Sequence, residues 1–258
     1  MAAFISRWMT EILKADQVSK KSPDTNPDLT HVSHWVFDLD DTLYPAESAI
    51  MSQVSSRITD YVSNLLDLNR EDAHKVQKQY LGEYGTTLNG LMAHHHINAR
   101  DFLDFVHDID TSVIEPDHRL ANLIKTLPGR RIVYTNGSLG HAENILHHLG
   151  LSHAFDDIFD VEASGYIPKP QREGFDKFTR HFDLPIHQSA MFEDSLRNLK
   201  TAHAMGFTTV LVRAKNGSRH DLGQVADDHM DHVHFDVDCL KNFLDSVQTS
   251  RTPGHDND

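Results

Sequence analysis

Short apolar runs that end in polar residues recur along the chain. The first is His34–Phe37 (HWVF), which leads directly into the acidic stretch Asp38–Thr42 (DLDDT). Further strands are predicted at 131–134, 158–161, 189–192, 208–212 and 232–235. Between these runs, apolar residues at spacings of three and four predict helices, for example at 141–149 and 195–205. Strands that alternate with helices are typical of the α/β class, in which a doubly wound parallel sheet is covered on both faces.

A different pattern occupies about residues 46–115. Apolar residues such as Ile50, Val54 and Ile58 fall there at helical spacings, and no strong strand pattern occurs. We therefore predict an α-helical domain that is inserted into the sheet-containing core. The predicted organisation is a flexible lead-in at 1–30, a core at 31–45 and 116–248, the helical insertion at 46–115 and a disordered tail at 249–258.

Composition narrows the classes of function. The chain has 258 residues and a formal net charge of −14, with 38 Asp and Glu against 24 Lys and Arg. Such a chain repels nucleic-acid backbones and anionic membranes, so we expect neither a nucleic acid polymer nor a membrane as its main partner. No apolar run approaches the roughly 20 residues that span a bilayer. The single cysteine, Cys239, fits a reducing compartment, and we expect a cytoplasmic protein whose oligomeric state stays open.

Polar residues follow three of the predicted strands directly. They are Asp38 and Asp40 after the first, Thr135 and Asn136 after the second, and Glu193 and Asp194 after a later one. Ligands of parallel sheets bind at the carboxyl ends of the strands, so these side chains should converge. Close carboxylates repel one another, and a hard divalent cation that prefers oxygen ligands relieves this repulsion. The pattern therefore predicts a Mg²⁺ site, with Asp194 as the second carboxylate ligand.

A phosphate would be repelled from a purely acidic site, because unit charges about 4 Å apart interact by roughly 4 kcal/mol at an effective dielectric near 20. Lys169 stands between two prolines that favour an extended loop, and its ammonium group would supply positive charge. The formal charges of Mg²⁺ and Lys169 nearly balance those of Asp38, Asp194 and a phosphate dianion. The net charge of the site is therefore close to zero only if Asp40 is protonated. A protonated Asp40 is also what a general acid requires.

Four motifs occur in the order Asp38–Thr42, Thr135–Gly137, Lys169–Pro170 and Glu193–Ser195. In this order and at these strand ends they resemble the motifs of the haloacid dehalogenase superfamily, over about residues 32–245. The resemblance implies that Asp38 is a nucleophile that forms an aspartyl-phosphate. It also implies that Asp40 protonates the leaving oxygen and later deprotonates the attacking water.

The resemblance implies the other parts of the site as well. Thr135 and the backbone amides of Asn136 and Gly137 would hold phosphate oxygens, and Lys169 would offset negative charge. Mg²⁺ would be bound by the Asp38 and Asp194 carboxylates and the Asp40 backbone carbonyl, with Glu193 as a nearby support. Dehalogenases of this superfamily need no metal and lack the second aspartate, so Asp40 favours phosphoryl chemistry. The helical insertion resembles the cap that closes over the active site in one branch.

Further segments resemble the pyrimidine 5′-nucleotidase subgroup. They are Asp38–Pro45 (DLDDTLYP), Tyr84–Leu91 (YGTTLNGL), the VHDID segment at 106–110 and His141–Leu146 (HAENIL). This resemblance implies that the substrate is a small phosphorylated metabolite, a nucleoside 5′-monophosphate such as UMP or CMP. It makes Tyr84, Asn89 and His95 candidate substrate contacts.

Three alternatives stay open at this stage. The protein could be another small-molecule phosphatase that acts on a sugar phosphate or phosphoglycolate, or a phosphomutase. A non-catalytic binding protein is a third possibility, but it predicts the loss of a central motif residue, and all are present. The triplet His94–His96 could suggest a transition-metal site, although neighbouring residues on a helix point in different directions and do not easily share one ion.

Overall fold

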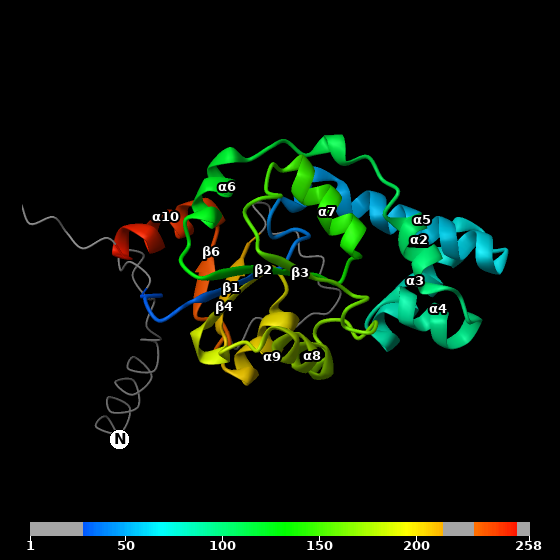
Figure 1. The fold of residues 1–258 in the computed structure, drawn as a ribbon. Helices are drawn as coiled ribbons and strands as arrows, with labels where there is room; N and C mark the ends of the chain where they lie inside the picture. The colour runs from blue at the N-terminus through cyan, green and yellow to red at the C-terminus, as the bar shows by residue number, and fades with distance from the viewer. Residues whose placement is uncertain (1–27, 214–229, 252–258) are drawn as a thin grey trace, which may run out of the picture.

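A parallel sheet forms the centre of the computed structural model, which describes residues 28–213 and 230–251 (Figure 1). Within these residues the strand order is β3-β2-β1-β4-β5-β6, and every paired strand is parallel to its neighbour. The strands are β1 (His34–Phe37), β2 (Arg130–Tyr134), β3 (Asp157–Phe159), β4 (Ser189–Glu193), β5 (Thr208–Val212) and β6 (Phe235–Val237). The order reverses between β1 and β4, which leaves a crevice at their carboxyl ends. The predicted doubly wound α/β class is confirmed.

The helices fall into two groups. The insertion between β1 and β2 contains α2 (Ile50–Leu66), α3 (Arg70–Tyr84), α4 (Thr87–His95) and α5 (Ala99–Val106). The sheet is flanked by α6 (His118–Lys125), α7 (Leu139–His148), α8 (Arg172–Phe182), α9 (Leu196–Met205) and α10 (Leu240–Arg251). Single 3-10 turns occur at Ala46–Ser48, Thr111–Val113 and Ile186–Gln188. None of the helices in the described parts of the chain is long and apolar enough to cross a membrane.

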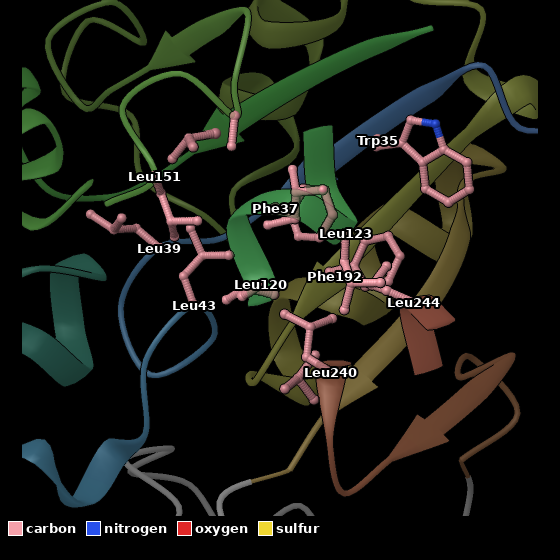
Figure 2. Packing of buried hydrophobic residues seen from close by; sticks show 14 of the residues in the cluster. Trp35, Phe37, Leu39, Leu43, Leu120, Leu123, Leu151, Phe192, Leu240 and Leu244 are labelled. Atoms are coloured by element: carbon pink, nitrogen blue, oxygen red, sulfur yellow. The ribbon is translucent and has the colours of Figure 1, made fainter. Parts of the chain in front are cut away.

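Helices cover both faces of the sheet. Trp35 and Phe37 of β1 belong to the cluster beneath α6, α7 and α10, whereas Val36 belongs to the cluster beneath α8 and α9. Figure 2 shows Phe37 and Phe192 beside leucines of α6 and α10. The rings of Phe37 and Phe192 stack with their centroids 4.4 Å apart. Because β1 is buried on both faces, it has an uninterrupted apolar sequence instead of an alternating one. Each fully buried side chain of this kind contributes about 1.5–3 kcal/mol to stability.

The helical insertion has its own apolar core. Leu88, Leu91, Phe102 and Val106 are buried there together with residues of α2 and α3. Val161, in the segment that follows β3, joins this cluster and so connects the insertion to the sheet-containing part. The helical insertion of the predicted fold is therefore present. Its exact boundaries at residues 45/46 and 115/116 stay predictions.

Several predicted boundaries differ from the structure. The last strand was predicted at 232–235 but lies at 235–237. In the residue before it, the His234 ring accepts from the Thr209 N–H at 3.0 Å. In the described part of the predicted lead-in, Leu29 is buried in the core, whereas Asp28 and Thr30 are exposed. Helix α10 reaches Arg251, inside the segment expected as a tail. Residues 1–27 and 252–258 lie outside the described residues.

Candidate active site

Three neighbouring strands end at the same level. The register pairs Phe37 of β1 with Val133 of β2 and with Phe192 of β4. Asp38, Tyr134 and Glu193 are each the next residue, so they lie side by side at the carboxyl edge of the sheet. The Asp38 N–H continues the ladder by donating to the Phe192 carbonyl at 2.9 Å. The structure thus brings together the strand ends that the sequence pattern singled out.

The Lys169 side chain connects these three strand ends. Its Nζ donates to Asp38 Oδ1 at 2.7 Å, to the Tyr134 carbonyl at 2.8 Å and to Glu193 Oε2 at 2.8 Å. Lys169 is only 2% exposed, and these three acceptors match the three hydrogens of its ammonium group. A buried cation needs such compensation, because it would otherwise lose its hydration without replacement. Our charge count from the sequence left Glu193 out, although its carboxylate contacts the ammonium group directly.

The loop after β2 positions Lys169. The Asn136 side chain accepts a hydrogen bond from Lys169 N at 2.8 Å and donates one to Lys169 O at 3.1 Å. Asn136 was predicted to bind phosphate through its backbone, and sequence reasoning missed this second role of its side chain. The buried Thr135 hydroxyl oxygen accepts from Gly137 N at 2.9 Å. That bond engages the Gly137 amide inside the loop, whereas Gly137 itself lines a cavity beside Asp40, and its predicted phosphate contact stays a prediction.

A group of carboxylates could hold a metal ion. Asp38, Glu193 and Asp194 each offer an oxygen, and these atoms lie within 4.8 Å of one another. The donors are all oxygens and mostly buried, which fits a hard divalent cation. Both oxygens of Glu193 already accept hydrogen bonds, from Lys169 and from Ser195 N at 3.3 Å. Asp38 and Asp194 are therefore the better candidates for direct ligands, and Glu193 suits the supporting role that was predicted for it.

Asp40 lies beside this cluster and has two strong hydrogen-bond donors. The Tyr44 hydroxyl donates to Asp40 Oδ1 at 2.6 Å, and His141 Nε2 lies 2.9 Å from the same oxygen. Burial favours the neutral form of Asp40, but the charge and hydrogen bond of His141 and the hydrogen bond of Tyr44 hold its pKa below the ordinary value. The protonated state predicted for Asp40 refers to the site with phosphate and Mg²⁺ bound, and it stays a prediction. Neither donor was recognised in the sequence, because both act through tertiary contacts.

Two adjoining cavities open at this edge of the sheet. One has a volume of about 420 Å³ and is bounded by Asp38, Lys169, Glu193 and Asp194. The other, of about 300 Å³, lies between the insertion and the sheet edge and is mostly apolar. The second cavity is lined by Met51, Val54, Ser55, Ile58, Gln77, Leu81, Thr86, Thr87, Leu88, Phe102, Leu103, Val106, His107, Gly137, His141 and Val161. Residues common to both cavities are Asp40, Met51, Lys78, Leu81, Gly85 and Asn136.

Residues 33–206 match the family model of haloacid dehalogenase-like hydrolases. The chain belongs to this family. It is also 25% identical over 244 residues to phosphate metabolism protein 8 of Saccharomyces cerevisiae, an alignment that covers 87% of this chain and 74% of the yeast protein. The predicted superfamily is thereby confirmed, whereas its pyrimidine 5′-nucleotidase subgroup stays a proposal.

Solved structures resemble this hydrolase in fold. A haloacid dehalogenase-type phosphatase from Thermococcus onnurineus gives a TM-score of 0.55 at 18% identity, with 85% of this chain and 97% of that chain covered. An L-2-haloacid dehalogenase from Xanthobacter autotrophicus gives 0.51 at 16% identity, with 84% and 98% covered. At these identities the similarity shows the fold alone, and it does not separate a phosphatase from a dehalogenase.

The predicted substrate contacts in the insertion of this hydrolase lie elsewhere. Tyr84 bonds His94 through its hydroxyl, and His95 Nε2 lies 2.9 Å from the Tyr80 hydroxyl. Asn89 bonds the carbonyl of Tyr84 at 3.4 Å. These contacts hold α3 and α4 together, and none of Tyr84, Asn89 and His95 lines either cavity. The structure brings Ser55, Gln77 and Lys78 to the cavities in their place, and only the helical spacing of α2 and α3 could have indicated those residues.

Burial changes the proton affinity of the carboxyl groups. It raises the pKa of Glu193 and of Asp194 to about 7, and nearby carboxylates add to the effect. The same cause, followed by the charges of Asp40 and Asp38, raises the pKa of Asp41 to about 7. The pKa of Asp38 is also raised well above its ordinary value, first by burial and then by Glu193. A cation that binds the ionised carboxylates would oppose these shifts.

These pKa values predict how stability depends on pH. The unfolded chain has ordinary carboxyl pKa values near 4, so Asp41, Glu193 and Asp194 bind protons more tightly in the folded protein. Their contribution to stability is complete below about pH 4 and is lost as the pH rises through about 7. Without metal, the melting temperature should fall between about pH 5 and pH 7.5, as measured by thermal unfolding in EDTA.

Magnesium should reverse this trend. Because it binds ionised carboxylates, its stabilising effect should be larger at about pH 7.5 than at about pH 5. The control is Asp194→Asn, which should remove most of the magnesium effect while the parent retains it. A magnesium effect of equal size at both pH values would contradict the assigned site.

Proposed function

We propose that this hydrolase is a Mg²⁺-dependent phosphomonoesterase that uses Asp38 as its nucleophile. The observation that carries the proposal is the convergence of Asp38, Asp194 and Lys169 at one cavity, with Asp40 on its wall. The yeast relative is described as a phosphate metabolism protein and one structural neighbour as a phosphatase, which supports the same class of reaction. The presence of Asp40 favours phosphoryl transfer over dehalogenation.

The residues can share the work of two successive displacements. Lys169 holds Asp38 Oδ1, so the other oxygen of Asp38 is the one that attacks phosphorus. The new bond between oxygen and phosphorus forms as the ester oxygen leaves with a proton from Asp40. Asp40 then takes a proton from water, the water oxygen attacks the phosphoryl group, and phosphate and free Asp38 are released.

Proton delivery requires a change in the state of Asp40. Its pKa is low in the free protein, and a phosphate dianion placed beside it raises that pKa by like-charge repulsion. Mg²⁺, held by the carboxylates of Asp38 and Asp194 and the backbone carbonyl of Asp40, would supply the positive charge that makes an acidic site receptive to a phosphate ester.

We propose nucleoside 5′-monophosphates as substrates, with pyrimidine nucleotides such as UMP and CMP first. Support comes from the apolar cavity of about 300 Å³ beside Asp40, whose size and lining suit a planar base. Gln77 lies on its wall, and the amide is held in one orientation by Thr59 at 2.6 Å and Ser55 at 3.1 Å. A polyhydroxylated sugar phosphate fits less well, because its hydroxyl groups would lose water without gaining partners.

The test is phosphate release from UMP, CMP, AMP, glucose 6-phosphate and phosphoglycolate, each with Mg²⁺, with EDTA, and with EDTA followed by excess Mg²⁺. We expect release from UMP and CMP with Mg²⁺, none with EDTA, and recovery after Mg²⁺ is restored. We also expect kcat/KM for UMP to exceed that for glucose 6-phosphate by at least about tenfold.

Each alternative gives a different result in this experiment. Full activity after thorough chelation would remove the metal from the reaction. A product that is an isomerised sugar phosphate would identify a phosphomutase. No release from any ester with any divalent cation would favour a non-catalytic binding protein.

A further inference from the structure

The two oxygens of the Asp40 carboxylate are used unequally. Oδ1 is contacted by the Tyr44 hydroxyl at 2.6 Å and by His141 Nε2 at 2.9 Å. Among the residues that the structure describes, no hydrogen bond to Oδ2 is present, and this oxygen lies on the side of Gly137. Both Tyr44 and His141 are 3% exposed, so the two donors are built into the interior of the protein.

We propose that His141 is a positioning residue that, together with Tyr44, fixes the Asp40 carboxylate so that Oδ2 meets the leaving oxygen of the substrate. The inference rests on the proposed phosphatase activity and adds a role that the four motifs do not contain. Because the rotation of a carboxylate about its terminal bond is soft, two donors on one oxygen are an effective way to select the other for catalysis.

Within residues 28–213 and 230–251, Asp40 is the only side chain that takes a hydrogen bond from the His141 ring. The second ring nitrogen, Nδ1, is buried there without a hydrogen-bond partner. A carboxylate can only accept, so Nε2 of His141 carries the ring hydrogen that is donated to Asp40. A buried imidazole loses its hydration, and the hydrogen bond to Asp40 compensates for part of this loss. An apolar residue would fill the same space if packing were the only requirement.

Neighbouring residues hold the His141 ring in place. Helix α7 begins beside it, where the Ser138 hydroxyl oxygen accepts from His141 N at 3.3 Å. His107, at the end of α5, stacks on the His141 ring with centroids 4.3 Å apart, and its Nδ1 lies 2.9 Å from Ser138 Oγ. A Cβ atom on Gly137 would lie 3.0 Å from His141 Cδ2, so the glycine permits the close approach. The insertion thus contacts Asp40 through one intermediate ring.

A positioning role predicts an effect that depends on the leaving group. p-Nitrophenolate is a stable anion and departs with little help, whereas the alkoxide of a nucleoside requires a proton from the general acid. Misorientation of Asp40 should therefore slow hydrolysis of an alkyl ester much more than hydrolysis of p-nitrophenyl phosphate. A change that only loosens packing would slow both reactions by similar factors.

The experiment compares His141→Leu, His141→Gln and Tyr44→Phe in the full chain with Mg²⁺. The side-chain amide of glutamine can donate from about the position of Nε2, and leucine cannot. For His141→Leu we expect kcat/KM, which reports the step in which the leaving group departs, to fall by about 30- to 100-fold for UMP and by less than about fivefold for p-nitrophenyl phosphate. His141→Gln should recover UMP turnover to within about fivefold of the parent. Tyr44→Phe, like His141→Leu, should slow UMP hydrolysis much more than p-nitrophenyl phosphate hydrolysis.

The possible results separate the two proposals. If the parent does not hydrolyse UMP, another alkyl ester takes its place in the comparison with p-nitrophenyl phosphate. It is whichever of glycerol 3-phosphate, glucose 6-phosphate and phosphoglycolate the parent hydrolyses fastest. Equal losses on both esters, or equal losses for leucine and glutamine, would overturn the role of His141 and leave the phosphatase intact. A parent that hydrolyses no phosphomonoester at all would overturn both. Thermal unfolding of each variant shows whether a loss of folded protein accounts for a uniform decrease.

Discussion

Replacement of Asp38 by asparagine is expected to abolish turnover, with kcat at least about a thousandfold lower than in the parent. An amide does not attack phosphorus, so the first displacement cannot begin. The variant should nevertheless fold, because asparagine has nearly the same size and its oxygen can still accept the hydrogen bond from Lys169 that spans 2.7 Å. The strand register that places residue 38 uses its backbone and is not affected.

Three measurements check this expectation. Phosphate release gives kcat, thermal unfolding shows that the variant is folded, and acid quenching with a labelled ester shows whether phosphate becomes attached to the protein. The parent should carry the label and Asp38→Asn should not. The matched control is Asp104→Asn, an exposed position on α5, which should leave all three results unchanged. Turnover of Asp38→Asn within tenfold of the parent would contradict the assignment of the nucleophile.

The sequence predicted the sheet well where strands are buried on both faces. β1, β2, β4 and β5 each contain three consecutive apolar residues, and their positions agree with the prediction to within a residue or two. β6 was displaced, because Phe235–Val237 is partly exposed and includes the exposed Asp236. Helix α8 was not predicted, although Phe175, Phe178 and Phe182 have helical spacing and are buried. Charged residues between these aromatic positions obscured the pattern.

The candidate site was predictable where it depends on strand ends. Asp38, Glu193 and Asp194 follow apolar runs, and parallel strands necessarily bring such positions to one edge. The protonation state of Asp40 was not predictable. It depends on His141, which is 101 residues away in sequence and reaches Asp40 only through the start of α7. A count of formal charges contains no information about such donors.

Substrate contacts were the least predictable part. A motif in the insertion indicates a family resemblance, but Tyr84 and His95 serve the packing of α3 against α4. Which helical face meets the cavity is decided by how the insertion rests on the sheet edge, a tertiary property that Val161 and Phe102 determine by packing together. Sequence periodicity shows which face of α2 is apolar, but it does not distinguish a face buried in the insertion from a face that lines a substrate cavity.

Replacement of Lys169 by methionine is expected to have the largest effect on stability. Methionine has a similar length but donates no hydrogen bond, so the Tyr134 carbonyl and the carboxylates of Asp38 and Glu193 each lose a donor. Removal of one partner from a buried ion pair typically costs about 3–5 kcal/mol. Catalysis should fall by at least about a hundredfold, because the charge that offsets the nucleophile and phosphoryl group is gone.

The dependence of this loss on pH separates electrostatics from packing. Without the ammonium group, the pKa values of Asp38 and Glu193, already raised by burial, should rise further. Both groups can then take up protons, so the destabilisation by Lys169→Met should be smaller at about pH 5 than at about pH 7.5. Denaturant unfolding at both pH values measures the difference, with Lys75→Met on the surface of α3 as a control that should unfold like the parent. A loss of equal size at both pH values would mean that Lys169 stabilises the fold by packing, and the electrostatic account of the three strand ends would then fail.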